Sequence, residues 1–151
     1  MSAGGADPVE LPHTLQRHVG LLVLRTAHLV KARVDAGLEP GGLRIRHYAI
    51  LQLLRTEGAV SQQAVGARLE IDPGTVVDLI DALEERGLVE RRRNPDDRRV
   101  YRLHLTDAGS AAIEQLEPVL AGLEEAALAP LDGQELETLK SLLMRVVAHA
   151  G

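Results

Sequence analysis

Cysteine, phenylalanine and tryptophan are all absent from this sequence. Without cysteine the chain can form no disulfide, no thiolate metal site and no thiol redox switch. Tyr48 and Tyr101 are its only aromatic residues, so the core must consist of Leu, Val, Ile and Ala, which suit a helical interior. A length of 151 residues is enough to bury such a core within one domain.

Long apolar runs are lacking too. The longest, Val19–Leu24, is interrupted by Gly20 and is far too short to span a bilayer. Residues 1–10 are small, polar and acidic, without the basic start and apolar run of a signal peptide, and we expect them to be flexible. We therefore expect a cytoplasmic protein that does not bind membranes.

Positive charge is scarce overall but concentrated in one segment. The formal net charge is −5, yet residues 86–102 contain seven arginines and three acids, so this window carries +4 and the rest of the chain −9. Such local asymmetry is typical of a protein that binds DNA. A solvated basic loop would show the same run, so the assignment depends on the surrounding elements.

Helical periodicity predicts long helices at both ends of the chain. Residues 11–36 and 43–55 form the first two, and residues 107–127 form a later one that begins at the N-cap Thr106. Asp132 starts the last helix. Its apolar stripe consists of Leu136, Leu139, Leu143, Val146 and Val147.

Two short helices in the middle of the chain are separated by a tight turn. Ser61 is a suitable N-cap for a helix over residues 62–69. Asp72 and Pro73 begin a second helix, which closes at Gly87. Its apolar residues recur at helical spacing: Val76, Leu79, Ile80 and Leu83. The pair is typical of a helix-turn-helix.

A β-hairpin is predicted directly after this second helix. Residues 88–93 and 98–105 have strand patterns, and residues 94–97 form the turn between them. A hairpin after a recognition-type helix is a wing. The sequence therefore predicts a mainly α protein with a small β-hairpin wing.

The domain organisation follows from which helices can bury their apolar faces against neighbouring elements. Residues 43–106 can bury a small core as a winged helix-turn-helix region. The helices at 11–36 and 107–150 have apolar stripes left over, which would otherwise meet water. We expect them to form a dimerisation region within one domain that spans residues 11–150.

Three segments resemble the MarR family of transcriptional regulators: Leu83–Arg91, Asp96–Arg99 and Leu105–Gly109. The family pattern is Asp-x-Arg in the wing, followed by Leu-Thr six and seven residues after the arginine. Asp97, Arg99, Leu105 and Thr106 hold these places. The resemblance covers residues 11–150, because the flanking helices also fall in the expected order.

The resemblance implies a regulator that binds double-stranded DNA as a homodimer, and a ligand-responsive repressor of a pseudo-palindromic operator. In similar proteins the wing arginine enters the minor groove and the aspartate orients it, which assigns these roles to Arg99 and Asp97. Arg98 would contact phosphate, with Arg91, Arg92 and Arg93 at the wing base. The positions where family members contact DNA in the helix-turn-helix correspond to Ser61, Gln62, Gln63, Thr75 and Val77.

Similar proteins also bind a small phenolic or aromatic effector between the dimerisation helices and the winged region. We expect residues near His18, Arg25, Tyr48 and Leu116 to line that pocket. No cofactor is expected.

The exposed face of the predicted recognition helix departs from the family pattern. It carries Gly74, Val77, Asp78 and Asp81, where similar proteins often carry Ser or Arg. Neither acid has a basic residue one helical turn away. Two unpaired carboxylates would repel phosphate and weaken base readout by this helix.

Three other functions compete with DNA binding. An enzyme is not expected, because the sequence lacks a nucleophile with a base, a glycine-rich phosphate loop and a His-Glu-x-x-His motif. A metal-responsive regulator would need a site assembled across helices, since no two of the six histidines lie three or four residues apart. A winged helix that binds protein instead of DNA is favoured only by the acidic recognition face.

Overall fold

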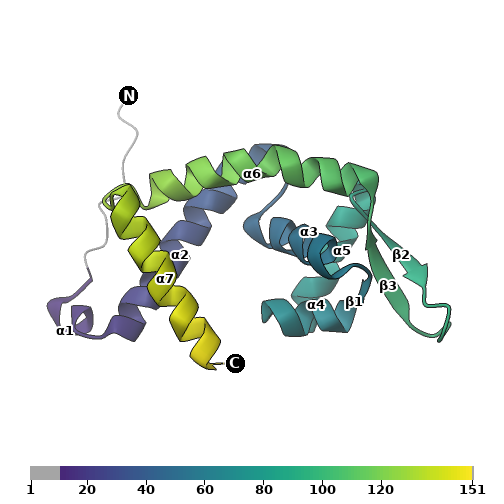
Figure 1. Ribbon diagram of the computed structural model, residues 1–151, viewed down its shortest axis with the longest axis horizontal. Helices are drawn as coiled ribbons and strands as arrows, with labels where there is room; N and C mark the ends of the chain where they lie inside the picture. Colours follow the sequence, from purple (N-terminus) through teal and green to yellow (C-terminus); the bar gives the residue numbers. More distant parts are fainter. Residues whose placement is uncertain (1–10, 151) are drawn as a thin grey trace.

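The computed structural model describes residues 11–150, and Figure 1 shows the described chain as a set of helices with one projecting hairpin. Its helical elements are α1 (His13–Gln16), α2 (Val19–Leu38), the 3-10 turn η1 (Glu39–Gly41), α3 (Ile45–Glu57), α4 (Gln62–Leu69), α5 (Pro73–Glu85), α6 (Asp107–Ala127) and α7 (Gly133–Ala150). Its strands are β1 (Val60–Ser61), β2 (Val89–Arg93) and β3 (Tyr101–Leu105), in the antiparallel order β1-β3-β2. The predicted fold class, mainly α with a small wing, is confirmed.

Side-chain caps start both helices of the helix-turn-helix where the sequence predicts them. The Ser61 hydroxyl oxygen accepts a hydrogen bond from the N–H of Ala64 at 3.1 Å. The carboxylate of Asp72 accepts one from the N–H of Thr75 at 2.9 Å. Hydrogen bonding by the Thr75 side chain, and after it by this backbone N–H, lowers the pKa of Asp72, so the acid stays ionised and attached to its own helix.

The caps of α6 and α7 also follow the sequence. Thr106 accepts from the N–H of Gly109 at 3.0 Å. Asp132 and Glu135 form a reciprocal capping box: each side chain accepts from the other residue's N–H at 2.9 Å. These bonds satisfy N–H groups that the first helical turn leaves without partners.

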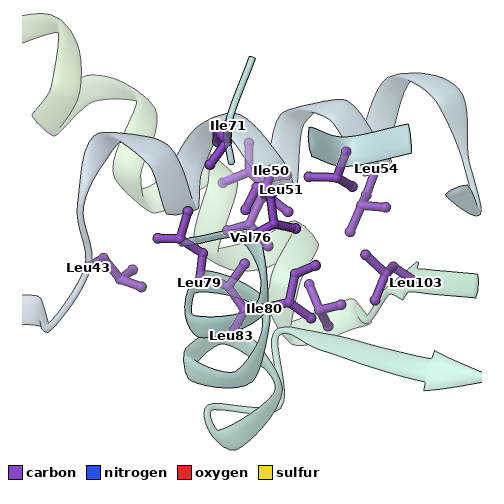
Figure 2. Close-up of a cluster of buried hydrophobic side chains, with 13 residues drawn as sticks. Leu43, Ile50, Leu51, Leu54, Ile71, Val76, Leu79, Ile80, Leu83 and Leu103 are labelled. Carbon is purple, nitrogen blue, oxygen red and sulfur yellow. The ribbon is translucent and has the colours of Figure 1, made fainter. Parts of the chain in front are cut away.

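The main core lies between the helix-turn-helix, α3 and the sheet (Figure 2). Ile50 and Leu51 of α3 meet Ile80 and Leu83 of α5, and Leu103 of β3 closes the cluster from the sheet side; all five are at most 1% exposed. Its buried side chains are all aliphatic, and Tyr48 packs against their edge. The winged region thus has a core of its own.

A second, smaller cluster joins α2 to α6. Val34 and Leu38 of α2 pack with Leu120 of α6. Gly37 lies against Leu123, and a Cβ at this position would overlap the leucine side chain. We predicted that the first helix ends at Gly37, but α2 continues through it to Leu38. This glycine allows close packing and does not end the helix.

Residues 11–36 do not form the continuous helix that periodicity predicted. The short α1 is separated from α2 at His18, which has an extended backbone (φ −104°, ψ 106°) and forms the N-cap position of α2. Pro12 precedes α1 and accepts hydrogen bonds from the first turn.

The wing is shorter than the sequence predicted. β3 begins at Tyr101, because residues 98–100 belong to the turn: the N–H of Asn94 donates to the carbonyl oxygen of Val100 at 2.8 Å. The two-residue strand β1 was not predicted. It pairs with β3 through Val60 opposite Leu103 and ties the start of α4 to the wing.

The two ends of the molecule differ in how well apolar side chains are covered. Figure 1 shows α1, α2 and α7 at one end and the hairpin at the other. No residue of α7 is buried, and α2 and α7 expose large apolar side chains, including Val19, Leu24, Met144 and Val147. No helix within residues 11–150 is long and apolar enough to cross a membrane.

Candidate DNA-binding surface

The outer side of the helix-turn-helix carries the residues predicted to meet DNA. Gln63 is exposed, and Val77 of α5 is 38% exposed. Gln62 and Thr75 are half-buried in the first turns of α4 and α5. The first turns of these helices direct free N–H groups and a positive dipole end outward, an arrangement suited to phosphate.

Arg91 of β2 links the wing to both helices of the motif. Its guanidinium donates to the carboxylate of Asp81 at 2.5 Å and pairs with the carboxylate of Glu84. Its backbone N–H donates to the same Glu84 at 3.0 Å. A longer bond of 3.4 Å reaches the side-chain oxygen of Gln62 in α4. One side chain thus holds β2, α5 and α4 together.

These contacts correct the expectation that Asp81 faces DNA without a basic partner. The partner is Arg91, which comes from the strand and not from one turn of the helix. Partial burial would lower the pKa of Arg91, but the carboxylates of Asp81 and Glu84 outweigh it and raise the pKa. Arg91 thus lies at the base of the wing, with its donors directed inward to Asp81 and Glu84.

The other two arginines of the run face different ways. The Arg93 guanidinium lies 5.8 Å from the ring centroid of Tyr101, the residue opposite it on β3. Arg92 points to the other face of the strand, where it pairs with Glu90. Both arginines are exposed. The structure therefore separates Arg91, Arg92 and Arg93 into three environments.

The wing tip is organised by backbone hydrogen bonds to side chains. The carboxylate of Asp97 accepts from the N–H of Arg99 at 3.0 Å. The side-chain oxygen of Asn94 accepts from the N–H of Asp96 at 3.2 Å. Arg98 and Arg99 are both exposed, so the turn presents two cations at its end.

A charged junction connects α2 to the winged region. Asp35 of α2 accepts from the N–H of Ile45 at 2.9 Å and pairs with Lys31 at 2.5 Å. Burial would raise the pKa of Asp35, but these hydrogen bonds outweigh it and lower the pKa. At the far end of α5, Arg86 donates to the carbonyl oxygen of Gly41 at 2.8 Å. The recognition helix is therefore attached to the loop that follows α2.

The four residues predicted to line an effector pocket lie in different surroundings. Tyr48 and Leu116 pack between the two apolar clusters. His18 is exposed and Arg25 half-buried on α2, and no hydrogen bond or ion pair within residues 11–150 joins either of them to Tyr48 or Leu116. A groove of about 950 Å³ between α6 and α7 has none of the four in its lining.

The described histidines do not gather into a metal site. Among residues 11–150, no group of three His, Asp or Glu side chains is placed to hold a metal ion. His47, the buried histidine of the described chain, accepts from the N–H of Arg44 at 2.9 Å through Nδ1. Through this hydrogen bond His47 caps the start of α3.

Two features of this surface went unrecognised in the sequence. Arg102 lies opposite Arg92 on the outer face of the wing, which strand alternation alone could have shown. The inward position of Arg91 has no local signal, because its partners are seven to twenty-nine residues away.

The fold and this surface define a winged helix-turn-helix protein that binds DNA. The MarR family model matches residues 43–101. A regulator of Bacillus subtilis, the uncharacterised HTH-type transcriptional regulator YkoM, is 31% identical over 123 residues, which are 82% of this chain and 77% of that protein. The chain belongs to the MarR family and is a transcriptional regulator, not an enzyme.

A second curated relative is the putative transcriptional regulatory protein for the hcr operon of Thauera aromatica. It is 33% identical over 99 residues, which cover 66% of this chain and 60% of that protein. This match therefore spans less than two thirds of the relative's length.

Solved structures of the family superpose over most of the chain. A probable transcriptional regulator from Pseudomonas aeruginosa is 32% identical, with a TM-score of 0.77 and coverage of 87% of this chain and 98% of that one. A mutant MarR from E. coli complexed with operator DNA is 26% identical (TM-score 0.71, coverage 85% and 92%). CouR from Rhodococcus jostii RHA1, bound to p-coumaroyl-CoA, is 30% identical (TM-score 0.69, coverage 89% and 94%).

Proposed function

We propose that this protein is a ligand-responsive repressor that binds a pseudo-palindromic operator as a homodimer. The observation that carries the proposal is the division of the molecule: a recognition helix and an arginine-bearing wing at one end, and helices with exposed apolar side chains at the other. Two copies joined at the apolar end would present two recognition helices. A two-fold dimer reads half-sites one DNA turn apart, about 34–36 Å.

The helix-turn-helix would supply the contacts on the major-groove side. Ser61, Gln62 and Gln63 lie at the start of α4, where backbone N–H groups favour phosphate. Thr75 and Val77 would meet base edges, because methyl groups of these side chains fit a thymine methyl. Since the oxygen of Gln62 accepts from Arg91, its amide NH₂ would donate to DNA, which disfavours bidentate recognition of adenine.

The wing would supply the contacts on the minor-groove side. Arg99 would insert its guanidinium into a narrow groove, where negative potential is concentrated. Arg98 and Arg92 would contact phosphates. Arg91 would act from behind the surface by holding the wing against α5, and Asp97 would shape the turn that carries Arg99.

The effector would be a small aromatic or phenolic molecule. CouR, one of the similar structures, is bound to p-coumaroyl-CoA, which contains a phenol. A site near His18, Arg25, Tyr48 and Leu116 would place the guanidinium of Arg25 on α2, the helix whose other end leads through the junction at Asp35 to α3. A ligand that shifted α2 would change the spacing of the two recognition helices, and a small rigid-body shift is enough to lose the fit to DNA.

Selection of bound fragments from the organism's own DNA tests this proposal. We expect enrichment of a site with two-fold symmetry, bound by a particle of twice the chain mass in sedimentation. Binding to random duplex should weaken steeply with salt. Absence of any salt-dependent duplex binding would favour a protein-binding winged helix and overturn the proposal.

A further inference from the structure

Arg92 and Arg102 lie directly opposite each other on the outer face of the wing. The register pairs Arg92 of β2 with Arg102 of β3, and Arg102 with Ser61 of β1. Directly opposite residues share one face of an antiparallel sheet. The neighbouring Leu103 points to the other face and is buried. The two guanidinium groups therefore lie side by side on the outer face, next to the half-buried Ser61, whose hydroxyl caps α4.

This pair carries excess positive charge. Like charges directly opposite each other in a sheet are destabilising. Arg92 pairs with Glu90 on its own strand, which neutralises at most one of the two cations. Among residues 11–150, the hydrogen bond of the Arg102 side chain goes to the carbonyl oxygen of Ala59 at 3.5 Å, which is long and neutral. Within residues 11–150, no second carboxylate forms an ion pair with either arginine.

The remaining arginines of the two strands are engaged on the opposite face. Arg91 is held by Asp81 and Glu84. Arg93 lies over the ring of Tyr101. Arg91 occupies the acids Asp81 and Glu84 on that face, and neither Arg91 nor Arg93 can replace the outward pair. Arg102 also lies outside the Asp-x-Arg motif, so it is a feature of this chain and not of that motif.

We propose that Arg92 and Arg102 together hold one backbone phosphate of bound DNA, beside Ser61. The proposal rests on the proposed DNA-binding function and adds a contact to it. Opposite Cβ atoms in a sheet are about 4.5–5.5 Å apart, so both guanidinium groups can reach a single phosphate. Guanidinium donors match phosphate oxygens in geometry and charge. The phosphate completes the charge balance of the pair.

The test counts phosphates through the salt dependence of binding to a fluorescent duplex of random sequence. The logarithm of the binding constant falls linearly with the logarithm of the salt concentration, and each phosphate contact contributes about 0.9 to the steepness of that slope. We expect the slope of the double variant Arg92→Gln/Arg102→Gln to be less steep by about 0.9 per protomer. The matched control Arg33→Gln/Arg145→Gln removes the same charge from the other end of the molecule and should change the slope much less. The variant Arg92→Lys/Arg102→Lys keeps both charges and should keep most of the slope.

The melting temperature of the DNA-free protein separates a binding role from a structural one. Because the pair is repulsive without phosphate, the double Gln variant should melt at the parent temperature or above it.

Four outcomes would contradict the proposal. If the parent binds DNA and the double Gln variant has the same salt slope as the parent, the shared phosphate is overturned and the proposed function stays intact. A loss of about 1.8 per protomer shows two separate phosphates and also overturns it. A lowered melting temperature in both the Gln and Lys variants shows a structural pair instead. A parent without salt-dependent duplex binding overturns both proposals.

Discussion

The carboxylate of Asp97 accepts the backbone N–H of Arg99 at 3.0 Å, so the acid of the Asp-x-Arg motif shapes the turn that carries the arginine. The carbonyl oxygen of Asp97 also accepts from the N–H of Val100 at 3.0 Å. No ion pair within residues 11–150 joins the Arg99 guanidinium to this carboxylate. In the DNA-free protein, Asp97 positions the backbone and leaves the guanidinium available.

The substitution Arg99→Ala should reduce affinity for the selected operator by about 1–3 kcal/mol per protomer. It should reduce affinity for random duplex less, because a guanidinium in the minor groove responds to groove width. Fluorescence anisotropy with both duplexes measures the difference. Arg98→Ala is the control and should weaken both duplexes alike. An equal loss on both duplexes with Arg99→Ala would reduce that residue to a phosphate contact.

Two substitutions of Asp97 separate its geometry from its charge. Asparagine keeps the oxygen that accepts the N–H of Arg99 and removes a negative charge near phosphate. Asp97→Asn should therefore bind the operator at least as tightly as the parent. Asp97→Ala loses the turn and should bind more weakly, although simple charge would strengthen binding. Tighter operator binding by Asp97→Ala would exclude a role for the turn.

Removing the Arg91 side chain should destabilise the free protein. Arg91→Met leaves Asp81 and Glu84 without their cation while keeping the bulk of the side chain. These two acids are 49% and 39% exposed, so water screens much of the effect and we expect a loss of about 1–2 kcal/mol. Urea unfolding gives the free energy of unfolding.

The salt dependence of stability checks the prediction for Arg91. The destabilisation by Arg91→Met should shrink at high ionic strength, because screening weakens the parent's partly exposed ion pairs. Arg92→Met is the control on the same strand, and its exposed pair with Glu90 should contribute less than 1 kcal/mol, roughly the usual value for surface pairs. Equal stability of Arg91→Met and the parent would show that the wing does not depend on this link.

Local signals explain why much of the fold was predictable. Caps such as Ser61, Asp72 and Thr106 bond to residues three positions away, so the sequence contains both partners. Gly87 ends α5 with a φ of +68°, in the left-handed region that favours glycine. Helix starts and stops with such signals fell within a few residues of their predicted places.

Non-local contacts explain what the sequence did not reveal. β1 has only two residues and exists because β3 lies beside it, so no periodicity could indicate it. The pairing of Arg91 with Asp81 depends on how the wing packs against α5. Gly37 resembles a helix stop, yet its reason is the side chain of Leu123 from a helix almost ninety residues later.

A glycine at the start of α6 should resist substitution for the same kind of reason. A Cβ at Gly109 would overlap the carbonyl oxygen of Leu88 and the side chain of Leu105. Helix propensity alone would favour Gly109→Ala by about 1 kcal/mol, but backbone cannot move aside cheaply. We expect a net loss of stability, measured by thermal unfolding of the DNA-free protein.

Gly74 is the matched control for that substitution. It lies in the first turn of α5, is exposed, and its Cβ would make only ordinary contact with Asp72 at 3.4 Å. Gly74→Ala should leave stability unchanged or raise it. If Gly109→Ala also raised stability, α6 would not be packed against Leu88 as closely as the structure has it.

The buried His47 should make stability depend on pH. Burial lowers its pKa, and the cations Arg44 and Arg86 lower it further, against a smaller opposite effect of Asp35. A lowered pKa means that the unfolded chain binds the proton more tightly. The contribution of His47 is therefore complete above its ordinary pKa of about 6.5 and is lost as pH falls toward the lowered value.

Chemical denaturation between about pH 7.5 and about pH 5.5 measures this loss. A protonated Nδ1 cannot accept the N–H of Arg44, so α3 would lose its cap. In His47→Gln the amide oxygen can accept the same N–H and does not titrate. The stability difference between parent and variant should narrow or reverse as pH falls. A difference that stays constant over this range would show that His47 does not contribute.

The apolar stripe of α7 should hold the proposed homodimer together. Leu139 is half-buried and Leu143 is 42% exposed, and both line the groove between α6 and α7. The double variant Leu139→Glu/Leu143→Glu would place two charges on a face that the dimer covers, and buried charges without partners are costly. Because the winged region has its own core, this variant should be a folded monomer. Sedimentation should give one chain mass, and circular dichroism should keep its helical signal.

The control Gln134→Glu/Ser141→Glu adds the same charge to other sides of α7 and should remain dimeric. A dimeric Leu139→Glu/Leu143→Glu variant would move the interface away from this stripe, and dissociation of the control as well would show that charge on α7, not burial of the stripe, governs assembly.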